Sequence, residues 1–183
     1  MGSHAANESH TSAQDSGAIQ GAESRMAGDP VLSSAARAFL DGCRVAHLAT
    51  GDAAGAPHVV PVCFACDWAP VAAEGESSAG WRIYSVIDAK PKRASPLRLK
   101  RVRNVLENPR VALVADRYDE DWSRLGYVLV TGSAMLVTAD PLHARALTLL
   151  RAKYPQYRSM ALEDAPVLML VPERCVTWGD LGA

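Results

Sequence analysis

The sequence predicts a mainly β protein, a small six-stranded antiparallel barrel with about three short peripheral helices. Six short segments are rich in β-branched and aromatic residues or alternate apolar with polar side chains, as half-buried strands do. Hairpin-length links between the strands and the scarcity of long helices favour a small antiparallel barrel. The predicted strands are residues 44–50, 56–67, 81–88, 110–116, 126–138 and 166–178.

Glycine and other turn-forming residues indicate where the strands end. Residues 51–55, with the sequence GDAAG, join the first two strands as a hairpin turn. Segments 70–80 and 118–124 are polar or rich in small residues, and we expect both to be loops. Gly132 lies inside the fifth predicted strand, where it indicates a β-bulge or a close approach of another backbone.

Two of the three helices have clear start signals. Ser33 or Ser34 caps a short helix that ends near Gly42. Asp140-Pro141 begins a longer helix that runs to about residue 154, because proline suits the first helical position.

The remaining helix follows the third predicted strand. Ser95-Pro96 indicates an N-cap and a first helical residue. Leu99, Val102 and Leu106 recur with helical spacing and predict the buried face, and the helix is expected to stop at Asn108-Pro109.

The junction between this strand and this helix is strongly basic. Strand end, turn and helix N-terminus together form a candidate anion site, because unpaired amides and the helix dipole would act with the basic side chains. The competing interpretation is a solvated basic helix face. The basic residues are Lys90, Lys92, Arg93, Arg98, Lys100, Arg101 and Arg103.

Composition limits the classes of function. The length of 183 residues indicates one domain, at 30–183. Residues 1–29 are polar and are expected to form a disordered leader. The net charge of the chain is −1. The nearly neutral net charge argues against nucleic-acid binding, as does the absence of aromatic residues among the basic residues of the 90–103 segment. We expect no membrane partner and a cytoplasmic location, because no apolar run is long enough to span a bilayer and no signal-peptide core is visible.

The cysteine and histidine residues do not predict a metal site. Cys63 and Cys66 have metal-ligand spacing, but residues three apart on one strand point to opposite faces. His47 and His143 are interpreted as structural, and we expect no bound metal. Four cysteines in a chain of this length do not indicate a disulfide framework either.

The ordered series of segments resembles a known family. RVAHLAT, PHVVPVCF, WRIYSVIDAKPK, RVRNVLENPRVALVAD and YVLVTGSA follow a short helix in the order found in split β-barrel flavoproteins related to pyridoxamine 5'-phosphate oxidase. The resemblance covers residues 37 to 178. Within the family, IDAKPK followed by YDEDWSRL is most similar to a branch regarded as using the deazaflavin coenzyme F420 in place of FMN.

This resemblance implies an FMN-binding type of split barrel and a homodimer with two cofactor sites at the subunit interface. Lys90 and Lys92 would hold the cofactor phosphate, with Arg98 as a weaker candidate. Trp122 would reach the ring from the partner subunit. The residues that would line the ring and ribityl chain are His58, Val59, Val60, Pro61 and Val62 on one strand and Tyr84 and Ser85 on its neighbour.

The expected function is that of a flavin-type oxidoreductase. Hydride would pass between bound coenzyme F420 or FMN and a small organic substrate, while the protein binds and orients the ring. Vitamin B6 oxidation is not expected, because the chain ends in VTWGDLGA without the arginine-rich C-terminal elements of the parent enzyme. No catalytic acid or base is identifiable. The alternative is a non-catalytic protein that carries or senses a flavin or haem on the same barrel.

Overall fold

The computed structural model describes residues 32–71, 80–88 and 96–182. The predicted leader 1–29, most of the predicted loop at 70–80 and the predicted phosphate ligands Lys90 and Lys92 lie outside the described residues. None of the helices within the described ranges is long and apolar enough to cross a membrane.

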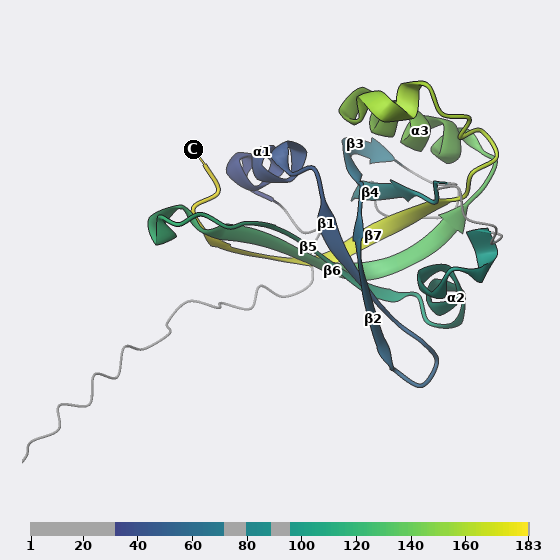
Figure 1. Cartoon of the computed structure of the whole chain (residues 1–183), viewed down its shortest axis with the longest axis horizontal. Coiled ribbons are helices and arrows are strands. Elements are labelled where there is room, and N and C mark those ends of the chain that lie inside the picture. Colours follow the sequence, from purple (N-terminus) through teal and green to yellow (C-terminus); the bar gives the residue numbers. More distant parts are fainter. Residues whose placement is uncertain (1–31, 72–79, 89–95, 183) are drawn as a thin grey trace, which may run out of the picture.

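The fold is built on one antiparallel sheet whose strand order is β2-β1-β5-β6-β7-β4-β3. The sheet curls without closing, so β2 and β3 form its two edges (Figure 1). This open, curled sheet confirms the predicted mainly β split barrel. The strands are β1 (Ala46–Gly51), β2 (Pro57–Val62), β3 (Ala65–Val71), β4 (Gly80–Val86), β5 (Arg110–Arg117), β6 (Gly126–Val137) and β7 (Val167–Gly179).

The number of strands is seven, and the predicted count of six was wrong. The predicted strand at 56–67 is interrupted at Cys63–Phe64, where the chain passes from one edge of the sheet to the other. The hydroxyl of Tyr154 accepts a hydrogen bond from the Phe64 amide at 2.9 Å and lies 2.8 Å from the Phe64 carbonyl oxygen. A side chain distant in sequence therefore satisfies the backbone at the break, and local periodicity carries no sign of it.

Helices cover the two faces of the curled sheet. α1 (Ser34–Gly42) and α2 (Lys100–Glu107) pack against the inner core, which includes Leu48, Leu113 and Val130. α3 (Pro141–Lys153) covers a second core on the outer face, over β3, β4 and the adjoining part of β7 (Figure 1). Three short 3-10 turns complete the described structure: η1 (Pro96–Arg98), η2 (Trp122–Arg124) and η3 (Pro155–Arg158).

Both helices with clear start signals begin as predicted. The Ser33 side chain accepts from the Ala36 amide at 3.1 Å. The Asp140 carboxylate accepts from the His143 amide at 2.9 Å, with Pro141 in the first turn. Side-chain capping at the N-terminus is a local interaction, which is why these starts are readable from sequence.

The start of α2 was predicted wrongly. Only a 3-10 turn begins at Pro96, Leu99 is extended with ψ 135°, and α2 starts at Lys100. The partly buried Leu99 side chain packs against the inner core, and this packing accompanies the break. The buried face comprises Val102 and Val105, whereas Leu106 is 63% exposed. Ser95 lies outside the described residues.

Gly132 confirms the predicted irregularity in the long strand. The register of β6 on β7 shifts between Thr131 and Gly132, which marks a bulge. A Cβ atom at Gly132 would collide with the carbonyl oxygen of Val171. The glycine is therefore required by the close approach of the two backbones.

Candidate functional site

The predicted cofactor strand is the edge strand β2, and its side chains divide between two faces. His58, Val60 and Val62 lie opposite the buried residues of β1, on the inner side of the sheet. Val59 and Pro61 project outward, and Val59 is 57% exposed. Because successive side chains alternate, a flat ring could contact both groups only along the strand edge.

Tyr84 and Ser85 are not on a strand that neighbours β2. β4 is hydrogen-bonded to β3 and β7, because the crossing at Cys63–Phe64 inserts β3 at that edge. Ser85 is buried on the inner side. Tyr84 is fully buried beneath α3 in the second core.

The Tyr84 hydroxyl is an unusual buried group. Its oxygen has no hydrogen-bond partner among the described residues, and burial, with Asp67 nearby, raises the pKa of Tyr84 to about 12. A buried hydroxyl without a partner is destabilising unless something pairs with it.

The basic segment is only partly described. Lys90 and Lys92 lie outside the described residues, and Arg98 is exposed on η1. Lys100, the first residue of α2, donates to the Asp52 carboxylate at 2.8 Å and so fastens α2 to the β1–β2 hairpin. The Glu107 carboxylate at the other end of α2 accepts from the Ala53 amide at 3.4 Å.

Arg101 is the functional candidate that the sequence interpretation did not single out. Its side chain is half-buried, and its Nε atom is buried without a hydrogen-bond partner among the described residues. Burial lowers the pKa of Arg101, and the neighbouring Asp88 acts in the opposite direction. The correct helix start is the signal that would have identified it, because it places Arg101 in the first turn of α2.

The first turn of α2 is suited to an anion. It contains no acidic residue, although acids normally occupy this position because of the helix dipole. Lys100, Arg101 and Arg103 stand there instead. The Val102 and Arg103 amides already donate to the Leu99 carbonyl oxygen, at 3.0 and 3.1 Å. The positive end of the helix dipole and the half-buried Arg101, with its unpartnered Nε atom, therefore lie at one place.

Trp122 lies at the other end of the molecule. It begins η2 in the β5–β6 connection and is 76% exposed, and Tyr118 in the same connection is 68% exposed. Figure 1 shows this connection at the tip of an arm formed by β5, β6 and β7, at the far end of the sheet from α2. Trp122 is therefore remote from β2 and α2 of its own chain.

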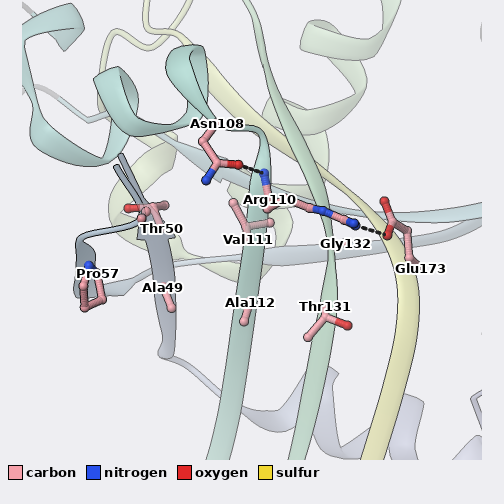
Figure 2. A pocket seen from close by; sticks show the side chains of 12 residues that line it. Ala49, Thr50, Pro57, Asn108, Arg110, Val111, Ala112, Thr131, Gly132 and Glu173 are labelled. Carbon is pink, nitrogen blue, oxygen red and sulfur yellow. Dashed lines mark hydrogen bonds and ion pairs between the residues drawn. The ribbon is translucent and has the colours of Figure 1, made fainter. Parts of the chain in front are cut away.

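A hollow of about 430 Å³ lies on the outer face of the sheet. At its rim, Arg110 Nη1 and Glu173 Oε2 are 3.0 Å apart, and Asn108 Oδ1 accepts from the Arg110 amide at 3.1 Å (Figure 2). None of the sequence-predicted site residues lines it. The lining residues are Ala49, Thr50, Gly51, Gly55, Pro57, Asn108, Arg110, Val111, Ala112, Thr131, Gly132 and Glu173.

The cysteine residues are dispersed between the two cores. Cys66 is buried in the inner core, whereas Cys63 packs against the second core. All four cysteines are free, and the described part of the chain contains no group of three or more His, Cys, Asp or Glu side chains that could hold a metal ion.

The open, curled sheet, with α1 and α2 on its inner core and α3 on its outer face, defines a split-β-barrel protein. The chain belongs to the pyridoxamine 5'-phosphate oxidase family, whose model matches residues 32–179. Members of this family commonly bind a flavin such as FMN. Among curated proteins, none matches this sequence.

Solved structures share the fold at low sequence identity. The conserved hypothetical protein Rv2991 from Mycobacterium tuberculosis is 19% identical, with a TM-score of 0.60 over 85% of this chain and 90% of its own. A haem-binding protein from Mycobacterium smegmatis is 19% identical, with a TM-score of 0.58 over 84% of this chain and 57% of its own. The haem storage protein HutZ from Vibrio cholerae is 16% identical, with a TM-score of 0.51 over 78% and 90%.

Proposed function

We propose that this protein is an oxidoreductase that binds coenzyme F420 or FMN and supports hydride transfer between the cofactor and a small organic substrate. Membership of the pyridoxamine 5'-phosphate oxidase family supports a flavin-type cofactor. The observation that carries the proposal is Arg101, a half-buried side chain whose buried Nε atom lacks a partner among the described residues, in a first helical turn without acids.

The residues present fit such a cofactor. A phosphate at the start of α2 would accept hydrogen bonds from Arg101 and would be stabilised by the positive end of the helix dipole. The β2 strand would provide an apolar wall for the ring, with the exposed Val59 and Pro61 on one side. Lys90, Lys92 and Arg98 remain our proposed additional ligands from the adjoining segment.

The chemistry of the reaction would come from the cofactor, since flavins and deazaflavins carry hydride themselves. The protein would hold the phosphate, fix the ring against β2 and restrict access of water. Its hairpin is already fastened to α2 by the Asp52–Lys100 ion pair, so the strand and the phosphate-binding helix form one unit.

We further propose that the protein acts as a homodimer with shared sites. Trp122 is 76% exposed at the tip of an arm that lies far from its own α2 (Figure 1). Large exposed aromatic side chains are characteristic of interfaces. Trp122 would therefore cover the cofactor ring of the partner subunit, as the family resemblance implies.

A non-catalytic carrier of flavin or haem is the second candidate. Two similar structures are named as a haem storage protein and a haem-binding protein, although at this identity they establish the fold alone. Haem would need an axial ligand. The half-exposed His58 on β2 is the candidate for that role.

Absorption spectroscopy of the purified full chain separates these functions. We expect saturable binding of coenzyme F420 or FMN, with a shifted absorption band, and subsequent turnover when a reductant and an organic acceptor are supplied. Tight haem binding with a Soret shift, abolished by His58→Ala, would support the carrier instead. Binding of none of the three would contradict both proposals.

A further inference from the structure

The hollow on the outer face of the sheet has a floor of small residues. Ala49 and Gly51 on β1 and Ala112 on β5 occupy outward positions of adjacent strands. Gly132 continues the floor at the bulge of β6. Larger side chains at Ala49, Gly51 and Ala112 would fill the space, whereas the Val171 carbonyl oxygen excludes any side chain at Gly132. The hollow of about 430 Å³ therefore follows from the residue types themselves. Its size is typical of sites for small molecules.

The polar groups at the rim are mainly hydrogen-bond donors. Arg110 contacts Glu173 through Nη1 alone, and its other guanidinium N–H groups make no hydrogen bond to the described residues. Asn108 accepts from the Arg110 amide through Oδ1, which leaves its Nδ2 amino group as a further donor (Figure 2). The Thr131 hydroxyl can donate or accept.

The ion pair between Arg110 and Glu173 is weak enough for a ligand to displace it. Their side chains are 49% and 75% exposed, respectively, and ion pairs this exposed contribute little because water screens them. A carboxylate can displace Glu173, or bind Arg110 beside it, since a guanidinium offers two parallel donors to a carboxylate.

We infer that this hollow is a binding site for a small carboxylate with a flat apolar body. The body would lie over Ala49, Gly51 and Ala112, and the carboxylate would accept from Arg110 and Asn108. The hollow is on the outer face of the sheet, whereas α2 packs against the inner core. The site is distinct from the proposed phosphate position at α2, but its floor residue Ala49 pairs with the outward Val59, the proposed wall for the cofactor ring, so the carboxylate site lies beside the ring position and is tested without cofactor.

A neutral ligand with an amide edge would use the same rim differently. It would donate to Glu173 while accepting from Arg110, so that both residues would favour binding. A carboxylate is repelled by Glu173 and attracted by Arg110. The two ligand classes thus predict opposite effects of removing the Glu173 charge.

The test uses 2-naphthoate and 2-naphthamide, which have the same shape, with the full chain and no added cofactor. Saturation-transfer NMR and fluorescence titration would give both affinities. We expect 2-naphthoate to bind about tenfold more tightly than 2-naphthamide, because charge-assisted hydrogen bonds are the stronger kind. Arg110→Gln should weaken 2-naphthoate about tenfold and 2-naphthamide less, because glutamine can still donate to a neutral carbonyl oxygen but lacks the charge that attracts a carboxylate. Glu173→Gln should strengthen 2-naphthoate.

Two further variants test the location. Ala112→Leu, on the floor, should abolish binding of both compounds, and the exposed Arg158→Gln, near α3, should change neither. Binding of 2-naphthoate that Arg110→Gln and Ala112→Leu leave unchanged would overturn the site, as would no binding at millimolar concentration. Tighter binding of 2-naphthamide, weakened by Glu173→Gln, would overturn the carboxylate assignment.

Discussion

Buried polar atoms without a hydrogen-bond partner are rare, and one of them belongs to the proposed anion site at α2. Within the described residues, such atoms are Arg37 Nε, Tyr84 Oη, Arg101 Nε and Asn104 Oδ1. Native proteins rarely leave buried groups unpaired without a ligand, a water or a functional reason. Arg101 combines this feature with a place in the first turn of α2, whereas Asn104 is partly satisfied by its 3.0 Å hydrogen bond to Thr50.

Replacing Arg101 should weaken cofactor binding through the phosphate. We expect Arg101→Gln to lower the affinity for FMN or coenzyme F420 by about 10- to 100-fold, since hydrogen bonds to charged groups contribute about 1.5–3 kcal/mol. The measurement is a fluorescence or absorption titration. Arg103→Gln is the matched control, because Arg103 lies on the same helix and is exposed.

Riboflavin distinguishes a phosphate effect from a general one. It lacks the phosphate, so its affinity should be nearly unchanged in Arg101→Gln. Lys90→Ala and Lys92→Ala should behave in the same way if these residues assist. Equal losses for FMN and riboflavin would show that Arg101 acts on the ring or on folding instead.

The unpaired Tyr84 hydroxyl leads to a prediction about the free energy of unfolding. Tyr84→Phe should raise the free energy of unfolding by about 1 kcal/mol, because it removes a buried hydroxyl without a partner and keeps the packing. Tyr154→Phe should lower it by about 1–3 kcal/mol, since its hydroxyl binds the Phe64 backbone. Denaturant unfolding without cofactor measures both. A marked loss of stability in Tyr84→Phe would show that the hydroxyl is paired.

Among the elements, those fixed by local interactions were predictable and those fixed by distant ones were not. Five of the six predicted strands and the two helix starts capped by Ser33 and Asp140 are correct, because alternation and capping are local. The break at Cys63–Phe64 depends on Tyr154, about 90 residues later, and the late start of α2 accompanies packing of Leu99 on the core. Neither contact leaves a local pattern.

The candidate site shows the same division. The basic character of the segment before α2 was evident, but its relevant residue depends on where the helix begins, and so Arg101 was missed. The hollow beside Arg110 depends on small residues brought together from β1, β5 and β6. No spacing within the sequence predicts that arrangement, because three strands must first be paired.

The Asp52–Lys100 ion pair, which joins the β1–β2 hairpin to α2, gives a pH-dependent prediction. The hydrogen bond from Lys100, with the Ala56 amide, holds the pKa of Asp52 below its ordinary value of 3.8. A carboxyl whose pKa is lower in the folded state stabilises the fold above its unfolded pKa, and loses that effect as the pH falls through the folded pKa. The Asp52–Lys100 ion pair should therefore be intact at neutral pH and lost in acid.

Asp52→Asn isolates this contribution. We expect its thermal midpoint to lie below that of the wild type at about pH 6, and the two midpoints to converge in acid as the pH falls through the lowered folded pKa of Asp52. Asp164→Asn, at an exposed position beyond η3, is the control. A midpoint difference that persists unchanged in acid would show that the charge of Asp52 is not the cause.

At the scale of the whole molecule, one sheet contributes to two cores, and the described helices leave part of its outer face uncovered. α3 covers the outer face over β3 and β4. Towards the arm, none of the helices in the described ranges lies over the outward side chains of β5, β6 and β7, and Tyr127 and Trp178 stack with ring centroids 5.8 Å apart. This uncovered surface comprises Val114, Tyr127, Leu129, Val176 and Trp178.

We expect this uncovered surface to form the homodimer interface. Exposed aromatic and aliphatic side chains on a sheet face are characteristic of obligate interfaces, and a two-fold axis would place each arm against the other subunit. Sedimentation or light scattering should give twice the chain mass of 19.5 kDa at micromolar concentration. Leu129→Arg, which places a charge in the centre of this surface, should yield monomers, whereas Ala152→Arg on the exposed side of α3 should not.

Because the cofactor sites are proposed to be shared, Leu129→Arg should also weaken binding of FMN or coenzyme F420. A Leu129→Arg protein that stays dimeric would exclude this surface, and a wild-type monomer that binds the cofactor with full affinity would exclude the shared site.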